Sequence, residues 1–595
     1  MPPTTSPWYD RISHISQTDW YGICAAIALA SWLVWCLASR GGRWAIRWHV
    51  MQLRRLLAYP LPRPFGHLDM ATVQQGSVVA LLLTVNILPL VLRARSWATV
   101  HRRAANLAVM NFIPLWTGWT FGFPAHLLGI DWSAAAWTHR WVGRMVIIHS
   151  VLHGAIAILG DGQPVQAIRQ HYVPVLAACS MILIVPVTLH AVVRRYPQLA
   201  MKCHYLLAVT GLASMSYHVW MRRSKSLWCL VAAAALWMFL SLASLAVPLR
   251  RRWGHTWPSV VISQHDELLR MDIAVPSAWK VEAGQYVYLW LPQAGLRTAS
   301  QLPLFYVSSW EDTPGSNDAR ASTAEQGVEL RQVATAAERD AAVPTVSQRH
   351  GSRGRTSWYT AMGHRTLRVL ARPQSSALAA ALYNAKHLHN IPHSALVLGP
   401  YGRPPDLAPF GIVLLIVEDI GIARVFSLIQ TLVMASEQHR AMVRKLIVVW
   451  QMEDLDNRRW VNMQHLLDLD RQEFKILRFV LYYRRNRKNE PSRNPGTRVR
   501  FMTGSVDVAQ TIRTYLNTRR GSMLVGVCAR QSIRNQVKAI VQPSLSDDLR
   551  LLDLDVEPCH RWSNTDTTVA DTTGPSRNHV QWVASRIAEG RGHSR

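Results

Sequence analysis

Two histidine pairs lie in apolar stretches that are long enough to form membrane helices. His139 and His153 belong to THRWVGRMVIIHSVLHGAI, and His204 and His218 to HYLLAVTGLASMSYH. Within each stretch, a spacing of fourteen residues leaves the two rings about 40° apart around a helix and ~21 Å apart along it. Imidazoles in lipid are costly unless they bind or pair with something. Two such helices side by side therefore predict two stacked b-type haems, one held by His139 and His204 and one by His153 and His218.

Three more side chains of the first stretch could support these ligands. His149 lies one turn before His153 and about 40° off its line, so we interpret it as a supporting residue, with exchange as a ligand left open. Arg140 and Arg144 flank His139 and could pair with haem propionates, or contact lipid head groups instead. Simple helix packing is the ordinary alternative for a single histidine, and two equally spaced pairs argue against it.

The N-terminal half contains repeated apolar runs with few charges. We predict seven membrane spans from the runs near 20–38, 74–93, 104–124, 139–160, 173–193, 203–221 and 227–248. The N-terminus lacks the short basic start of a cleaved signal, so we expect the first span to be retained.

The basic loops suggest how these spans are oriented. Loops 39–55, 194–202 and 250–252 favour the cytosolic side, which places the C-terminal half in the cytosol. Other cations would then lie outside, where they could attract an anionic substrate; these are Arg93, Arg95, Arg102, Arg103, Arg222, Arg223 and Lys225.

Net charge and cysteine usage exclude other classes of protein. The chain has 595 residues, a net charge of +29 and a pI near 10.6, which alone would suggest nucleic acid. Many cations sit just outside apolar runs, so we expect the lipid bilayer as their partner and no nucleic acid. The seven cysteines follow no CxxC spacing, which argues against a zinc site or a disulfide framework.

The C-terminal half changes to shorter, alternating patterns. SVVISQHDELLRMDIAV and GQYVYLWLP predict antiparallel strands of a small β-barrel. Residues 313–357 lack an apolar period and predict a disordered insertion. HSALVLGPYG, GIVLLIVEDIGIARVFSLIQTLV, KLIVVWQM and SMLVGVCAR alternate strand and helix patterns, which indicates a doubly wound α/β domain with a parallel sheet.

These stretches together resemble the fungal ferric reductase transmembrane family, relatives of the NADPH oxidases. The matching segments are HRRAANLAVMNFIPL, HRWVGRMVIIHSVLHG, KCHYLLAVTGLASMSYHVW, GQYVYLWLP, LPLFYVSSW, LVLGPYG and VCARQS, between residues 74 and 562. The resemblance implies that cytosolic NADPH reduces FAD, which passes single electrons through two haems to an extracellular ferric chelate. It also implies a multi-pass protein of the plasma membrane with iron-uptake proteins as partners.

The resemblance also implies the division of the chain. It gives an N-terminal segment with the first span (1–73), a haem-binding membrane domain (74–249), an FAD-binding β-barrel (255–398), an NAD(P)-binding α/β domain (399–562) and a polar tail (563–595).

The expected FAD site departs from the family pattern. The family has a His-Pro-Phe-like triplet followed by hydroxyl residues, whereas this chain reads LPLFYVSS from Leu302. By resemblance, the FAD-binding residues are Pro303, Phe305, Tyr306, Ser308, Arg372 and Ser375, with the last two near the diphosphate.

The expected NADPH site departs further. The family's Gly-Gly-x-Gly-Ile-Thr loop is replaced by Glu418, Asp419, Ile420, Gly421 and Ile422, with Ala423 last. Two carboxylates would crowd and repel a pyrophosphate, at ~1 kcal/mol per close charge pair even in water. By resemblance, the NADPH-binding residues are Gly399, Gly402, Gly421, Ile422, Cys528 and Arg530.

The preferred interpretation is a haem-containing transmembrane ferric-chelate reductase. One alternative is a catalytically silent relative that binds haem, has lost NADPH and acts as a membrane partner. A superoxide-producing oxidase and a metal transporter are the others.

Overall fold

The computed structural model describes residues 17–41, 61, 70, 72–115, 118–160, 172–252, 257–265, 267–295, 302–313, 364–471, 475–485, 498–546 and 548–554. Apart from Thr313, the predicted insertion at 313–357 lies outside these residues, as does the predicted tail. The chain divides into two compact units, mainly Met1–Ala243 and Ser244–Ile540.

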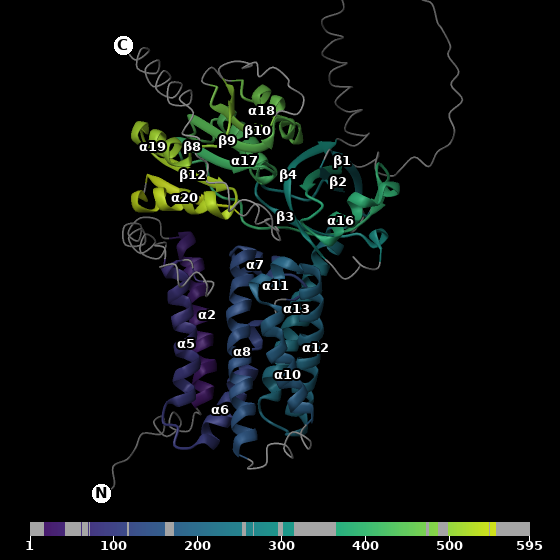
Figure 1. Cartoon of the computed structure of the whole chain (residues 1–595), viewed down its shortest axis with the longest axis vertical. Coiled ribbons are helices and arrows are strands. Elements are labelled where there is room, and N and C mark those ends of the chain that lie inside the picture. The colour runs from purple at the N-terminus through teal and green to yellow at the C-terminus, as the bar shows by residue number, and fades with distance from the viewer. Residues whose placement is uncertain are drawn as a thin grey trace, which may run out of the picture. The chain divides into compact units, whose positions relative to one another are not determined.

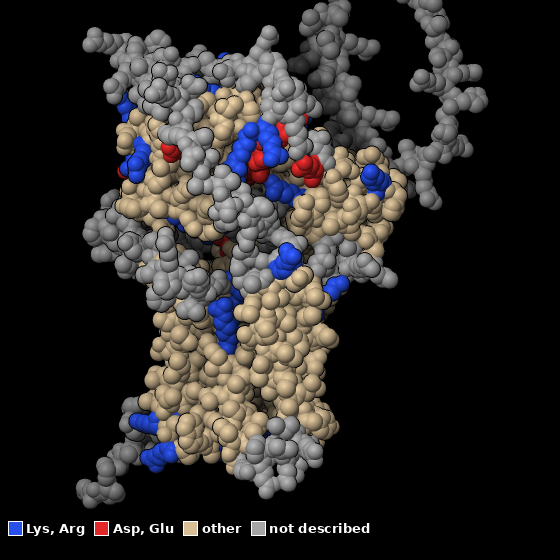
Figure 2. All heavy atoms as spheres, in the orientation of Figure 1, with Lys and Arg blue, Asp and Glu red and all other residues tan. Residues whose placement is uncertain are grey.

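The first unit is helical (Figure 1). Its helices are α2 (Gln17–Gly41), α5 (Val73–Val91), α6 (Trp97–Met110), α7 (Gly122–Leu128), α8 (Trp132–Gly160), α10 (Tyr172–Val187), α11 (His190–Arg195), α12 (Pro197–Met221) and α13 (Leu227–Arg252), with a 3-10 turn η1 (Ile113–Leu115). On the face shown in Figure 2, they present a band of uncharged residues between groups of Lys and Arg side chains.

Three helices in the described part of the chain are long and apolar enough to cross a membrane, namely α5, α8 and α13. Shorter apolar helical segments lie at Trp20–Trp32 and Tyr172–Val187. These three helices are possible membrane spans, and the predicted number of seven spans stays a prediction.

The span predicted at 104–124 is wrong as a single helix. Helix α6 ends at Met110, the short turn η1 follows, and α7 begins at Gly122. Asn111 caps α6, and its side-chain amide donates to the carbonyl oxygen of Leu107 at 2.8 Å. Pro114 then lacks the N–H that a continuing helix would need.

Arg103 has a structural role that its position in the sequence did not suggest. Its Nη1 donates to the carbonyl oxygens of Pro89 at 3.1 Å and Leu92 at 2.6 Å. These carbonyls belong to the last turn and cap of α5, where acceptors lack partners within the helix. Arg103 therefore ties α6 to α5, in addition to any attraction for an anionic substrate.

The second unit begins with an antiparallel sheet in the order β6-β1-β2-β5-β4-β3-β7. The strands are β1 (Ser259–His265), β2 (Leu268–Pro276), β3 (Tyr286–Trp290), β4 (Leu304–Thr313), β5 (His364–Ala371), β6 (Pro392–Ser394) and β7 (Leu396–Tyr401), with α16 (Ala377–Asn384) against them. Apolar residues on one face, such as Val260, Ile262 and Ile273, form its core. The predicted antiparallel strands are present, and the sheet is a half-barrel where a small β-barrel was predicted.

The rest of the second unit is a parallel sheet in the order β11-β10-β9-β8-β12-β13. Its strands and helices, in chain order, are β8 (Ile412–Glu418), α17 (Gly421–Glu437), β9 (Lys445–Asp454), α18 (Met463–Leu469), β10 (Leu477–Arg485), β11 (Val499–Thr503), α19 (Val508–Thr518), β12 (Met523–Cys528), α20 (Gln531–Val541) and β13 (Leu549–Asp553). The predicted doubly wound architecture is present, and its strand order reverses between β8 and β12, where such folds bind ligands.

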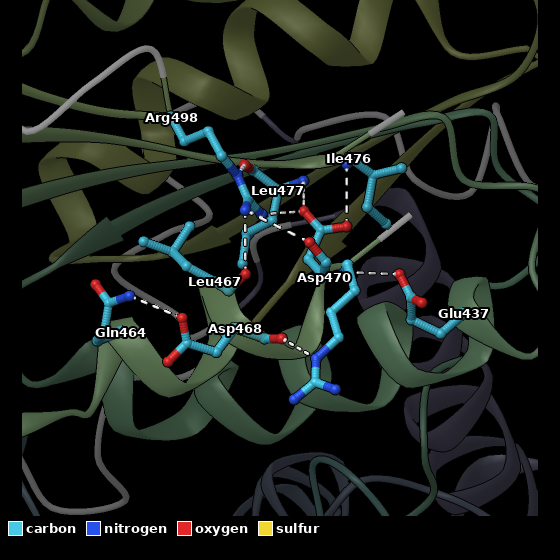
Figure 3. A network of polar contacts seen from close by, with 9 residues as sticks. Glu437, Gln464, Leu467, Asp468, Asp470, Ile476, Leu477 and Arg498 are labelled. Atoms are coloured by element: carbon cyan, nitrogen blue, oxygen red, sulfur yellow. Dashed lines mark hydrogen bonds and ion pairs between the residues drawn. The ribbon is translucent and has the colours of Figure 1, made fainter. Parts of the chain in front are cut away.

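A buried carboxylate fixes the start of β10 and β11 (Figure 3). Asp470, which is 2% exposed, accepts backbone N–H groups of Ile476 at 3.2 Å and Leu477 at 3.0 Å. It also forms an ion pair with Arg498, which donates to the carbonyl oxygen of Leu467 at 3.0 Å. These bonds anchor the connection from α18 into the sheet, away from the strand reversal.

Candidate haem and nucleotide sites

Helices α8 and α12 bring the predicted histidine pairs together. The ring centroids of His139 and His204, the first pair, are 6.4 Å apart, and those of His153 and His218, the second pair, are 6.5 Å apart. Two imidazoles that each bind one first-row metal ion through a bond of ~2 Å have ring centres about 6 Å apart. Both pairs thus have a separation that suits one iron between two imidazoles.

The first pair retains buried ring nitrogens. Nδ1 of His139 and Nδ1 of His204 have no hydrogen-bond partner among the residues described. A histidine that only held helices together would normally use its buried nitrogens in hydrogen bonds. The ring of Phe121 meets His139 edge-on, with centroids 5.4 Å apart, so one side of this site is apolar. These residues fit a haem.

The second pair includes a ring whose tautomer is fixed. Nδ1 of His153 lies 3.1 Å from the carbonyl oxygen of His101. Because a carbonyl oxygen can only accept, this Nδ1 carries the proton and Nε2 keeps its lone pair. Neutral imidazole with a free Nε2 is the form that binds metal, and a hydrogen bond from the other nitrogen is its usual support. The second pair also fits a haem.

His149 belongs to a different network. Its Nε2 lies 3.1 Å from Oδ1 of Asn86, which also accepts from Nδ2 of Asn111 at 2.7 Å. Tyr21 donates its hydroxyl to Oδ1 of Asn111 at 2.8 Å. His149 is 2% exposed and both asparagines are fully buried. The contact with Asn86 speaks against its exchange for His153 as a ligand.

The two arginines beside His139 have different surroundings. The guanidinium of Arg144 lies over the ring of Trp141, 4.4 Å from its centroid. Arg140 is exposed on α8 next to His139. Their predicted contacts with haem propionates remain predictions.

The candidate FAD residues of β4 point to opposite faces of the strand. Phe305 packs in the barrel core and is 4% exposed, so its ring is not presented for stacking on a flavin. Tyr306 faces the other way, and the guanidinium of Arg424 from α17 lies 3.9 Å from its ring centroid. Ser308 donates its hydroxyl to the carbonyl oxygen of Arg368 at 2.8 Å. Pro303 is partly buried just before β4.

The candidate diphosphate residues are engaged within the chain. Nη2 of Arg372 lies 3.2 Å from Oδ2 of Asp419. The hydroxyl of Ser375 donates to the carbonyl oxygen of Arg372 at 2.7 Å. With Arg424 over Tyr306, these contacts occupy the groups that would receive FAD, so the residues as arranged do not fit it.

The replaced glycine loop is closed by an ion pair at the strand reversal. Glu418 ends β8, is 2% exposed and accepts from the backbone N–H of Arg530 at 2.9 Å and from its Nε at 2.6 Å. Asp419 has a φ of 45°, a conformation that glycine adopts more easily.

Backbone donors at the start of α17 are also satisfied locally. Ile422 N–H donates to the carbonyl oxygen of Asp419 at 3.3 Å, and Ala423 N–H to that of Ile420 at 2.9 Å. A pyrophosphate at a helix N-terminus needs such donors. Together with the two carboxylates, this arrangement does not fit the phosphates of NADPH.

The other candidate NADPH residues serve packing. A Cβ on Gly421 would lie 2.5 Å from the carbonyl oxygen of Cys528, so glycine is required for α17 to approach β12. Ile422 is fully buried. Gly399 lies within β7 of the barrel sheet, so the boundary predicted at residue 399 falls inside a strand, and Gly402 follows directly. Gln285 donates to the carbonyl oxygen of Gly402 at 3.4 Å.

Sequence reasoning missed His101, Asn86 and Arg424. Their roles depend on contacts between different elements, which the spacing of residues along the sequence does not indicate. Within the described ranges, no group of three or more His, Cys, Asp or Glu side chains could hold a metal ion.

No family model matches the chain, and no curated protein is found as a relative. Solved structures similar to it include the cytochrome P450 reductase GcoB of Amycolatopsis, at 13% identity over 51% of this chain and 70% of that one, with a TM-score of 0.31. A ferredoxin reductase in carbazole 1,9a-dioxygenase has 10% identity, covers 50% and 68%, and has a TM-score of 0.29. The FAD/NAD-binding domain of a nitric oxide dioxygenase from Vibrio cholerae has 11% identity, covers 50% and 99%, and has a TM-score of 0.29.

Proposed function

We propose that the chain is a membrane oxidoreductase whose helical unit carries electrons through two b-type haems to a ferric chelate on the far side of the membrane. The observation that carries this proposal is the pair of imidazole separations, 6.4 Å and 6.5 Å, between α8 and α12. His139 and His204 would hold one haem, and His153 and His218 the other. Haem supplies one-electron chemistry when bound.

The chain's own residues define the remaining parts of the proposal. Apolar neighbours such as Phe121 limit water around the first pair, and His101 orients His153 in the second. Arg140 is exposed and adjacent to His139 in the sequence, and an anionic haem edge is the partner it suits. The plasma membrane, ferric chelate and iron-uptake partners are parts of the proposal that rest on the family resemblance alone.

The source of electrons is the open part of this function. The resemblance implies NADPH and FAD as this source. The loop at Glu418 and the face of Tyr306 do not fit these groups as arranged.

A haem spectrum of the purified full-length chain tests the haem part. We expect two b-type haems per chain in the dithionite-reduced minus oxidised spectrum. His139→Ala and His218→Ala should each remove about half of the signal, because each abolishes one pair. His126→Ala, which alters an exposed histidine of α7, is the control and should retain both haems. A wild-type protein without haem would refute the proposal.

A second candidate function is the catalytically silent haem-binding partner. The observation that favours it is the set of internal ion pairs, Glu418 with Arg530 and Asp419 with Arg372. Addition of NADPH to the purified protein separates the candidates. Haem reduction by dithionite but not by NADPH with FAD would favour the silent partner, whereas rapid reduction by NADPH would exclude it. Reduction of ferric citrate by the reduced protein tests the proposed acceptor.

A further inference from the structure

Among the residues that the structure describes, the second histidine pair has a stacked neighbour that the first pair lacks. The imidazole of His101, from α6, stacks on the imidazole of His153, with ring centroids 4.0 Å apart and planes inclined by 27°. On the first pair, Phe121 meets His139 only edge-on. The two candidate haem sites are thus built differently, although their ligand separations are nearly equal.

Reciprocal hydrogen bonds hold His101 and His153 together. Nδ1 of His153 lies 3.1 Å from the carbonyl oxygen of His101, and Nδ1 of His101 lies 3.1 Å from the carbonyl oxygen of His153. Carbonyl oxygens accept only, so both Nδ1 atoms carry a proton. The ring of His153 is therefore restrained by stacking on the ring of His101 and by the two hydrogen bonds between these residues.

We infer that His101 is a positioning residue for the second haem, which makes the two haems electronically unequal; this inference rests on the proposed function. A ligand imidazole that donates its second N–H to a carbonyl is a more basic ligand. A more basic ligand favours ferric over ferrous iron and lowers the midpoint potential. Nδ1 of His204 has no such acceptor among the described residues, whereas the backbone of Leu115 interacts with the His139 ring. The contrast therefore depends on His204, and the haem of the first pair should have the higher potential.

The side chain of His101 affects the potential of the second haem by fixing the orientation of the His153 ring. The acceptor for His153 is a backbone carbonyl, which any substitution retains. What a substitution removes is the stacked ring and the N–H that binds the carbonyl of His153, and with them the fixed orientation of the His153 ring. Loosening that orientation weakens the N–H···O bond, so the potential of the second haem should rise.

A redox titration of the full-length protein in lipid nanodiscs, followed by haem absorbance, tests this inference. We expect two midpoint steps in the wild type, and His218→Ala identifies the step of the second haem by removing it. In His101→Ala the second step should move upward by about tenfold in the ferric-ferrous equilibrium, or about 59 mV for one electron, while the first step stays. His101→Phe, which keeps a flat ring but no N–H, should shift the same step by less. His126→Ala is the control.

The outcomes separate this inference from the proposed function. Movement of the second step alone supports the role of His101. Two steps that stay unchanged in His101→Ala, or that move together, would overturn it and leave the haem proposal intact. If His101→Ala retains fewer than two haems, His101→Phe decides by the same criterion, because its ring fills the same space. A wild type without haem overturns both.

Discussion

Substitution of Glu418 by Gln should loosen the ends of β8 and β12. Glu418 is 2% exposed and its carboxylate binds both the guanidinium and the backbone N–H of Arg530, whose side chain is 20% exposed. Removal of one partner from a buried ion pair costs about 3–5 kcal/mol, because the other charge stays buried. Arg530 is partly exposed, so the lower value applies to Glu418→Gln, and the upper value to Arg530→Met, which strands the fully buried carboxylate.

Native-state hydrogen exchange of the full-length protein measures this loss locally. A cost of about 3 kcal/mol corresponds to about 10²-fold faster exchange of peptides from β8 and β12, and about 5 kcal/mol to more than 10³-fold. The double variant Glu418→Gln/Arg530→Met should recover most of the protection, because replacing the whole pair avoids a stranded charge.

The control lies at the same edge of the sheet. Glu453 is 45% exposed and pairs with Arg485 at 3.5 Å, so Glu453→Gln should cost below about 1 kcal/mol. Exchange in Glu418→Gln equal to that of the wild type, or equal to that of Glu453→Gln, would show that the carboxylate does not hold the two strands together. The same result would remove the main argument against phosphate binding at this loop.

Two predictions concern pH. Burial alone would raise the pKa of Asp553, but hydrogen bonds and charge from Arg534 and Lys538 outweigh it and hold the pKa below its ordinary value. This stability is present above the unfolded value of about 3.9 and is lost as the pH falls through the folded value. The protection factors of the β13 amides, which correct for the intrinsic pH dependence of exchange, should therefore stay constant from about pH 7 to 5 and fall only below about pH 4; a fall near pH 6 would contradict the ion pairs. Burial, with little opposition from Arg478, raises the pKa of Tyr515 to about 12. Stability should fall as the pH rises through the unfolded tyrosine value of about 10, and Tyr515→Phe should reduce this alkaline loss in a thermal melt.

The sequence predicted the elements whose patterns are local. Alternating and continuous apolar runs predicted the antiparallel strands around Val260 and the parallel strand that ends at Glu418. A spacing of fourteen residues on each of two helices was enough to predict which histidines face each other. In both cases the period of the backbone decides which side chains share a face.

Contacts between elements that are distant in the sequence could not be predicted from local patterns. Hydropathy joined residues 104–124 into one span, because it cannot register that Asn111 caps a helix and binds Asn86. Strand alternation does predict that Phe305 and Tyr306 face opposite ways, but only the structure shows Arg424 over Tyr306. The carboxylates of the loop were expected to repel phosphate, whereas the structure shows them paired with Arg530, which follows β12, and Arg372, which follows β5.

The hydrogen-bond network around Asn86 links several helices of the first unit. Asn86 on α5 finds its partners on α6 and α8, and Asn111 in turn receives Tyr21 from α2. The side-chain amide nitrogens of Asn86 and Asn111 bind carbonyl oxygens of their own helices, but their Oδ1 atoms would lack these donors on isolated helices in hydrocarbon. Helices α2, α5, α6 and α8 therefore complete these hydrogen bonds only as a set, so a chain truncated before His149 should lose the contacts that hold α5 and α6 together.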